Sequence, residues 1–300
     1  MLFRAVIVLV SLMLVSGVTM TSASAAIRPD PARADADKAP GYKNGCHLHQ
    51  KGSTPNGCVY GDTKAKRTIT LVGDSKARQW LPTLDRYGKK KRWRVVAHTK
   101  SACSFSQADL PMPSSQKRYT SCMVWNDKVL ARLKKDKADV VVVALYNKYA
   151  RKSKTARTSA QRQAAMFKGL RSSWRAVTRS GSRLIVLNSS PYIGTPYAGH
   201  PSWEAPDCVA ANRSRPSVCD VPAARALTAR SVWTDQDRSR VLHGMTRANV
   251  IDLNPKLCGP DVCRVVIGDV LIYRDNHHLS ATAARWLYPY LRNRLDPLIR

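Results

Sequence analysis

The sequence predicts an α/β fold, a three-layer α/β/α sandwich around a central, mostly parallel sheet. Short apolar runs rich in β-branched residues alternate with longer segments of helical spacing, and 44% of the 300 residues are hydrophobic. Near-continuous apolar strands suit a parallel sheet that helices cover on both faces. Strand–helix alternation over this length therefore predicts one large domain built of three layers.

The amino terminus carries the features of an export signal. Arg4 precedes the apolar run Ala5–Met20, and Ala23-Ser24-Ala25 supplies a small-residue cleavage pattern. We therefore predict that residues 1–25 are a signal peptide and that the protein is secreted or associated with the cell envelope. The apolar run is shorter than the ~20 residues of a bilayer span, which favours a cleaved signal peptide. An uncleaved anchor is the alternative.

Composition divides the remaining chain into a linker and one domain. Residues 26–45 are rich in Pro, Ala and Asp and lack periodicity, which predicts a flexible linker. The domain is predicted over residues 46–300, with a proline-rich, ordered insertion at 190–222 over the sheet edge. Trp203 and Tyr197 in the insertion are candidates for stacking on a sugar ring, although packing beneath the loop is the simpler expectation.

Four apolar runs and a shorter fifth are the predicted strands. Each is rich in valine, isoleucine or leucine, which favours a strand buried on both faces. In chain order the predicted strands are Thr68–Val72, Arg94–His98, Asp139–Leu145, Arg183–Asn188 and Val250–Leu253. Helical spacing predicts helices over Ala77–Tyr87, Val124–Lys135, Ala160–Ser180 and Ser280–Leu295, the last with Ser280 as its N-cap.

The chain is strongly basic. Lys+Arg 50 against Asp+Glu 20 gives a formal net charge of +30, which favours an anionic environment. The densest basic stretches are Lys89–Arg94, Lys148–Arg157 and Arg171–Arg183; solvated surface is the plain interpretation, and contact with anionic cell-envelope polymers is the functional one. We expect no nucleic-acid partner, because no aromatic-interleaved basic motif accompanies the charge.

The cysteine pattern fits an oxidised framework in an exported protein, because the chain has 8 cysteines, an even number. Proximity along the chain favours four local pairs, namely Cys46–Cys58, Cys103–Cys122, Cys208–Cys219 and Cys258–Cys263. No CxxC motif is present, and the one metal-like cluster, Cys46-His47-Leu48-His49, adjoins a predicted disulfide. We therefore predict no metal site and no cofactor.

Chemically useful groups follow two predicted strands and precede the last predicted helix. Gly73-Asp74-Ser75 follows the first strand and Asn147 the third, while Asp275 and His278 lie three residues apart before the closing helix. In an open α/β sheet the carboxyl ends of the strands hold the working residues. A nucleophilic serine needs a base to remove its proton and a carboxylate to orient that base, and these residue types are all present.

Each of these groups also has a structural interpretation. In that interpretation Asp74 and Ser75 are helix caps and nothing more, and His278 is a structural histidine on a turn. His277 competes with His278 for the role of base. Asn147 belongs to a residue type that is common in turns after strands.

The order of these motifs resembles that of the SGNH (GDSL-like) hydrolases, with Gly-Asp-Ser after the first strand, Asn after the third and Asp-x-x-His before the last helix. The stretches GDSKARQWLP (73–82) and YRDNHHLSATAARWL (273–287) are similar in particular to the SGNH domain of acyltransferase-3 proteins. The resemblance spans about residues 68–292 and implies an SGNH, flavodoxin-like sandwich. That domain often follows a membrane-embedded acyltransferase domain, so a separate membrane acyltransferase is a candidate partner.

The resemblance also implies roles for individual residues. Ser75 would be the nucleophile, His278 the general base and Asp275 the acid that orients it. The oxyanion hole would consist of the Ser75 N–H, a backbone N–H at Ala102 after the second strand, and the side chain of Asn147. Ala102 stands where the family has glycine, a change that a backbone donor tolerates if its φ is negative.

Two further departures from the family pattern lie near the site. Leu145 stands where a glycine is expected two residues before Asn147, and Lys76 stands where relatives often have histidine. A competing motif is weaker: Ser114 and Lys117 match the SxxK pattern of penicillin-binding proteins, but neither SDN nor KTG follows.

Together these features predict a secreted serine esterase or O-acyltransferase that acts on acyl esters of cell-envelope carbohydrate through an acyl-enzyme on Ser75. The substrate would be an acylated carbohydrate or another ester. The departures in the oxyanion hole and the charge motivate the alternative, a non-catalytic or weakly active module that binds envelope polymers on the same fold. Turnover that depends on Ser75 would distinguish the two.

Overall fold

The computed structural model describes residues 26–115, 117–146, 157–194, 203–228 and 235–299. The predicted signal peptide, most of the basic stretch at 148–157, Asn147 and Tyr197 lie outside the described residues. Within the described ranges, no helix is both long enough and apolar enough to cross a bilayer.

A seven-stranded, mostly parallel sheet forms the middle layer. All five predicted strands are present and run parallel, as β3 (Thr68–Gly73), β4 (Arg94–Lys100), β5 (Val140–Ala144), β6 (Arg183–Leu187) and β8 (Ala248–Ile251). Two short strands extend the edge beyond β4: β1 (His47–Leu48) pairs with it in parallel and β2 (Cys58–Gly61) antiparallel. The order β1-β4-β3-β5-β6-β8 places β3, which leads into Ser75, inside the sheet.

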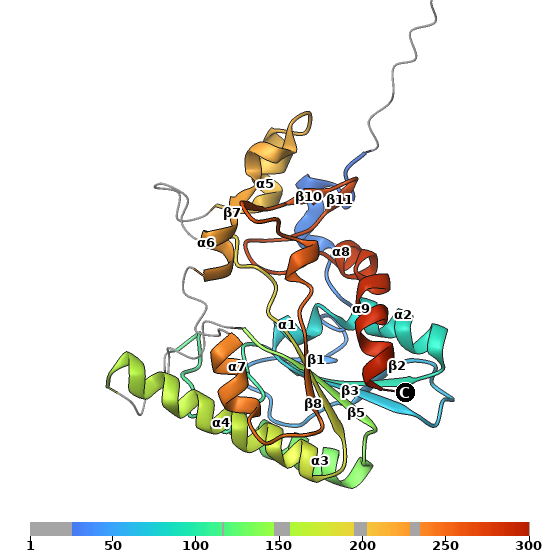
Figure 1. The fold of residues 1–300 in the computed structure, drawn as a ribbon, viewed down its shortest axis with the longest axis vertical. Helices are drawn as coiled ribbons and strands as arrows, with labels where there is room; N and C mark the ends of the chain where they lie inside the picture. The colour runs from blue at the N-terminus through green and yellow to red at the C-terminus, as the bar shows by residue number, and fades with distance from the viewer. Residues whose placement is uncertain (1–25, 116, 147–156, 195–202, 229–234, 300) are drawn as a thin grey trace, which may run out of the picture.

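Helices cover both faces of the sheet, which confirms the three-layer sandwich (Figure 1). On one side α2 (Leu81–Lys91) packs against α8 (Ala281–Trp286) and α9 (Tyr288–Leu295); on the other, α4 (Ser159–Arg179) packs against α3 (Thr120–Asp136) and α7 (Asp235–Leu242). Neighbouring strand residues enter different cores, since Leu71 packs with the α2 side and Val72 with the α4 side. Both faces of the central strands are therefore buried, which explains their unbroken apolar runs.

Two of the predicted helices are divided in the structure. The segment predicted at 77–87 consists of α1 (Ser75–Arg78) and then α2, which has Pro82 in its first turn. The closing segment consists of α8 and α9, with Pro289 in the first turn of α9. Proline lacks an N–H and fits only the first turn, so each proline marks a new helix start. Ser280 is the N-cap of α8, as predicted, and its hydroxyl accepts a first-turn N–H at 2.9 Å.

The segment 26–45 differs from the flexible linker that its composition predicts, because it lies packed along the domain and contains the 3₁₀ helix η1 (Pro31–Ala36). Asp37 accepts the first two N–H groups of α8, one through its main-chain oxygen and one through its carboxylate, each at 2.8 Å. Ala34 and Ala39 are buried in the core on the α2 side. Alanines and prolines give no hydrophobic periodicity, which is why the sequence concealed this packing.

The described part of the insertion at 190–222 is folded. Its elements are α5 (Ala205–Ala211), η3 (Pro216–Cys219) and β7 (Val221–Pro222), followed by α6 (Ala223–Thr228). The remaining elements are β9 (Val262–Cys263), which pairs with β7, the hairpin β10 (Val266–Ile267) and β11 (Val270–Leu271), and two 3₁₀ turns, η4 (Asn254–Lys256) and η5 (Asp296–Leu298). Trp203 is half-buried and packs against the core, in agreement with the expectation of packing beneath the loop.

The cysteines lie at disulfide distance in the four sequence-local pairs, Cys46–Cys58, Cys103–Cys122, Cys208–Cys219 and Cys258–Cys263. All eight are among the described residues, and none is free. Such bonds persist in oxidising compartments, so they fit an extracellular or periplasmic protein.

Candidate active site

The strand-to-helix turn after β3 presents Ser75 at the first residue of α1. Asp74 is the N-cap of that helix, and its buried carboxylate accepts the N–H of Lys76 at 2.7 Å and the N–H of Tyr146 at 2.9 Å. Gly73 has φ 142°, and a Cβ there would lie 2.3 Å from the main-chain oxygen of Ala144. Only glycine fits this position, so the turn that aims Ser75 depends on it.

Ser75, His278 and Asp275 form one hydrogen-bonded chain. His278 Nε2 lies 2.8 Å from Ser75 Oγ, and His278 Nδ1 lies 2.7 Å from Asp275 Oδ2. The serine comes from the end of β3 and the other two from the loop before α8, where His278 lies 203 positions after Ser75. The structure thus brings together the three residues that the sequence suggested as nucleophile, base and orienting acid.

Asp275 is held as a carboxylate. Its Oδ1 accepts the main-chain N–H groups of His277 and His278 at 2.9 and 2.7 Å, and Arg274 lies 3.1 Å from its Oδ2. Burial alone would raise the pKa of Asp275, but the hydrogen bond from His278 and the charge of Arg274 outweigh burial and hold that pKa below its ordinary value. An ionised Asp275 can only accept, so it fixes the proton of His278 on Nδ1.

His278 is neutral near pH 7. Its side chain is 11% exposed, and burial lowers its pKa to about 4 despite the opposing influence of Asp275. With the proton on Nδ1, the lone pair of Nε2 points at the Ser75 hydroxyl. The arrangement can therefore take the hydroxyl proton as the serine attacks an electrophile.

His277, the competitor for the role of base, has no hydrogen bond to Ser75. Its ring lies against the ring of His278, with centroids 3.9 Å apart, and its Nδ1 is in contact with Asn276 Oδ1. Its ring also lies 5.0 Å from that of Tyr146. The geometry favours His278.

Two clusters have the residue types of a metal site. Asp275, His277 and His278 have potential ligand atoms within 4.8 Å of one another, but both ring nitrogens of His278 already have hydrogen-bond partners. In the other cluster, Cys46 belongs to a disulfide and His47 lies 3.0 Å from Thr99 Oγ1. Each cluster is thus explained without an ion.

The oxyanion side departs from what the sequence suggested. Ala102 follows β4, but its φ is 54°, in the left-handed region, whereas the substitution of glycine by alanine was expected to be tolerated through a negative φ. The backbone keeps the conformation that glycine favours, at a cost of about 1–2 kcal/mol for alanine. Two contacts beside it hold the loop: the Cys103–Cys122 disulfide and the Tyr119 hydroxyl, which donates to the main-chain oxygen of Ser101 at 2.6 Å. Asn147 lies outside the described residues.

Sequence reasoning missed a buried polar group beside the triad. Lys76, noted only as a departure from the family pattern, is 1% exposed and donates from Nζ to Ser190 Oγ at 2.9 Å and to the main-chain oxygen of His277. Gln79 donates to the same Ser190 oxygen at 3.3 Å. The spacing of Lys76 and Gln79 on one helix was visible, but their partners lie more than 100 positions away.

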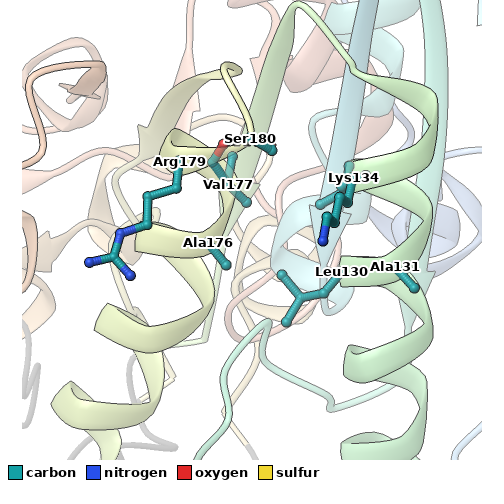
Figure 2. Close-up of a pocket in the computed structure, with 8 residues that line it drawn as sticks. Leu130, Ala131, Lys134, Ala176, Val177, Arg179 and Ser180 are labelled. Carbon is teal, nitrogen blue, oxygen red and sulfur yellow. Dashed lines mark hydrogen bonds between the residues drawn. The ribbon is translucent and has the colours of Figure 1, made fainter.

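A groove of about 370 Å³ lies between the C-terminal halves of α3 and α4 (Figure 2). Leu130, Leu133 and Val177 line it together with Lys134 and Arg179. Helices of this fold run antiparallel to the parallel strands, so the C-terminal ends of these helices lie near the amino ends of the strands. Ser75 follows the carboxyl end of β3, at the opposite end of the sheet. The groove is therefore separate from the serine site.

Known proteins share this fold. A family model described as "SGNH domain (fused to AT3 domains)" matches residues 45–293, most of the chain. The structure is similar to that of the periplasmic domain of a lipopolysaccharide acetyltransferase from Salmonella ser. Paratyphi A, with a TM-score of 0.53 and 14% identity over 79% of this chain and 86% of that chain. No curated protein matches the chain. At this identity the structural likeness concerns the fold, whereas the family match extends from just before the first cysteine into α9. The chain therefore belongs to the family of SGNH domains fused to AT3 domains, a family of acyl esterases and acyltransferases.

Proposed function

We propose that the protein is an exported serine esterase or O-acyltransferase that acts on acyl esters of cell-envelope carbohydrate. The observation that carries the proposal is the continuous chain from Ser75 Oγ to His278 to the Asp275 carboxylate, at 2.8 and 2.7 Å. A buried, neutral histidine between a serine and a carboxylate is the arrangement that acyl transfer through a serine requires.

The first half-reaction forms an acyl-enzyme. Ser75 Oγ attacks the ester carbonyl carbon while His278 Nε2 takes the hydroxyl proton, and the carbonyl oxygen becomes an oxyanion. Asp275 stabilises the imidazolium that forms. The oxyanion then reforms the carbonyl, the bond to the leaving alcohol breaks, and the alcohol takes the proton from His278. The main-chain N–H groups of Ser75 and Ala102 and the side chain of Asn147 are the proposed oxyanion donors.

The second half-reaction returns the enzyme to its starting state. Water or a sugar hydroxyl loses its proton to His278 and attacks the acyl carbonyl, and Ser75 leaves and regains a proton. Water gives an esterase, whereas a sugar acceptor gives a transferase. No metal or organic cofactor is needed for either route.

The substrate class rests on two supports. The structural neighbour is named as the periplasmic domain of a lipopolysaccharide acetyltransferase. The net charge of +30 favours association with anionic polymers such as those of the envelope. A separate membrane acyltransferase that supplies acyl groups is the partner we propose for the transferase route.

Hydrolysis of a short-chain aryl ester by residues 26–300 tests the serine mechanism. We expect Ser75→Ala to lower kcat/KM by about 1,000-fold or more, because the substitution removes the hydroxyl that His278 activates. The matched control is Ser114→Ala, since Ser114 belongs to the competing SxxK motif and its hydroxyl bonds to Gln50; it should retain full activity. A loss with Ser114→Ala and none with Ser75→Ala would reverse the assignment.

The left-handed conformation of Ala102, in place of the family's glycine, favours a second candidate function. Alanine is strained in this conformation, and a turn that relaxed out of it would misplace the oxyanion donor and leave a module that binds envelope polymers by charge without turnover. A folded protein that is inactive toward esters with and without Ser75, yet retained on anionic envelope polymer in low salt, would establish that function instead.

A further inference from the structure

A buried polar cluster joins the helix that carries Ser75 to the loop that carries His278. Lys76 Nζ donates to the main-chain oxygen of His277 and, at 2.9 Å, to Ser190 Oγ. Gln79, one turn further along the chain, donates from Nε2 to Ser190 Oγ at 3.3 Å and accepts the N–H of Leu279 at its Oε1 at 3.0 Å. Lys76, Gln79 and Ser190 are all buried, between 1% and 4% exposed.

These contacts hold the peptide groups on both sides of His278. The oxygen of His277 belongs to the peptide group before His278, and the N–H of Leu279 belongs to the peptide group after it. Each is held by a side chain from α1 or its C-cap, within four residues of Ser75. The backbone of the base is therefore fastened to the backbone of the nucleophile, independently of the bond between their side chains.

We propose that Lys76, Gln79 and Ser190 are positioning residues that set the separation of Ser75 and His278. The inference rests on the proposed serine mechanism and deepens it. Placement within a fraction of an ångström matters because a misplacement of about 1 Å can cost on the order of 100-fold in rate. Ser190 links the two contacts, because its hydroxyl accepts hydrogen bonds from both Lys76 and Gln79. It lies in the segment after β6 and so ties the cluster to another strand of the sheet.

Lys76 does not serve as an alternative base. Its Nζ is directed to Ser190 and His277, and no hydrogen bond within the described residues joins it to Ser75. Its side chain passes near the ring of Tyr146, with Nζ 5.9 Å from the centroid. The lysine acts on the peptide beside the base.

Lys76 carries its charge at acid pH, because burial lowers its pKa to about 7 against the opposing influence of Asp275 and Asp74, and this charge gives a second, separable effect. Burial is the main cause of the lowered pKa of His278, Asp275 opposes it, and the cations Lys76 and Arg274 lower that pKa further. The ring of His277 also lies against that of His278, and His277 and His47 are themselves kept neutral, because burial lowers their pKa values to about 2 and about 3. Removing Lys76 should therefore raise the pKa of His278, whereas removing the uncharged Gln79 should not.

The test compares Lys76→Met with Gln79→Met, which are similar in volume to the residues they replace. Ester hydrolysis and labelling of Ser75 by a fluorophosphonate are measured from pH 3.5 to 8, with Lys134→Met as the control for charge loss at an exposed site. We expect both substitutions to lower kcat by about 10- to 100-fold with little change in KM. Only Lys76→Met should move the acid limb upward, by about one pH unit.

The direction of the acid limb follows from the protonation states. His278 must be neutral to act as base, so activity is present above its pKa of about 4 and is lost as the pH falls through that value. A higher pKa in Lys76→Met shifts that loss to higher pH. A merely structural role would lower stability without moving the limb.

The outcomes separate this inference from the proposed function. No labelling and no turnover in the unsubstituted protein would sink the serine mechanism itself. Full turnover in the unsubstituted protein with unchanged rates in Lys76→Met and Gln79→Met would overturn the positioning role alone. If Lys76→Met does not fold, Gln79→Met and Ser190→Ala decide the matter, and wild-type kcat in both rejects it. NMR titration of His278 provides the pKa without reference to activity.

Discussion

The two sides of the candidate site are held together by different kinds of bond. On the base side, the loop with Asp275 and His278 is fixed by hydrogen bonds, many of them to buried charged groups. On the oxyanion side, the turn with Ala102 is tied to α3 by the Cys103–Cys122 disulfide. Proton concentration therefore acts on the first side and thiol reductants on the second, and the two can be disturbed separately.

The largest effect should come from removing the base itself. His278→Ala should lower kcat/KM by about 1,000-fold or more, since His278 is the base bonded to the Ser75 hydroxyl among the described residues. His277→Ala should cost less than about 10-fold, because its ring has no bond to Ser75 and the main-chain oxygen that Lys76 holds is retained. Steady-state hydrolysis of an aryl ester measures both. A larger loss for His277→Ala than for His278→Ala would assign the role of base to His277 instead.

An intermediate effect should come from the covalent tie on the oxyanion side. Replacing both Cys103 and Cys122 by alanine should lower the free energy of unfolding by about 3 kcal/mol, because the unfolded chain regains the freedom of a loop of 19 residues. The control is the Cys208–Cys219 pair, which closes a loop of 11 residues in the insertion. Its removal should cost a similar free energy in chemical denaturation.

Activity distinguishes these two disulfides. Loss of the Cys103–Cys122 bond should lower kcat in the folded protein, whereas loss of the Cys208–Cys219 bond should leave kcat unchanged. Equal kcat values for the two double variants would show that the disulfide stabilises the fold but does not organise the oxyanion side.

The smallest effect should come from Ala102→Gly. Glycine relieves about 1–2 kcal/mol of left-handed strain, but it adds about 0.4–1 kcal/mol of freedom to the unfolded chain. The net expectation is a gain of about 0.5–1 kcal/mol, a rise in Tm of roughly 1–2 °C by calorimetry. A lower Tm would indicate that the alanine is not strained at this position.

The sequence revealed those parts of the molecule that its local patterns encode. The five parallel strands appear as apolar runs because β3, β5 and their neighbours are buried on both faces. The Ser280 cap and the order of Ser75, Asp275 and His278 were likewise readable along the chain. β1 and β2 were not, because strands of two and four residues at a sheet edge leave no apolar run.

Contacts between distant segments were beyond sequence reasoning. A lysine normally stays in water, and Lys76 is buried because its acceptors are a main-chain oxygen and a hydroxyl that only the folded chain supplies. The packing of residues 26–45 depends in the same way on Asp37 reaching the N–H groups of α8. The left-handed φ of Ala102 contradicts the simple expectation for alanine, since the surrounding loop overrides local preference.

The separation of 203 positions between Ser75 and His278 has a consequence for how the protein matures. During synthesis from the amino terminus, Ser75 is made long before His278. The segment at 26–45 likewise cannot form its contact with α8, through Asp37, until α8 has been made. Closing such long loops is slow because the entropy cost comes before the contacts that repay it. The site therefore assembles late, and a nascent chain or a truncated fragment that has Ser75 but lacks residues 275–299 also lacks the proposed base and the carboxylate that orients it.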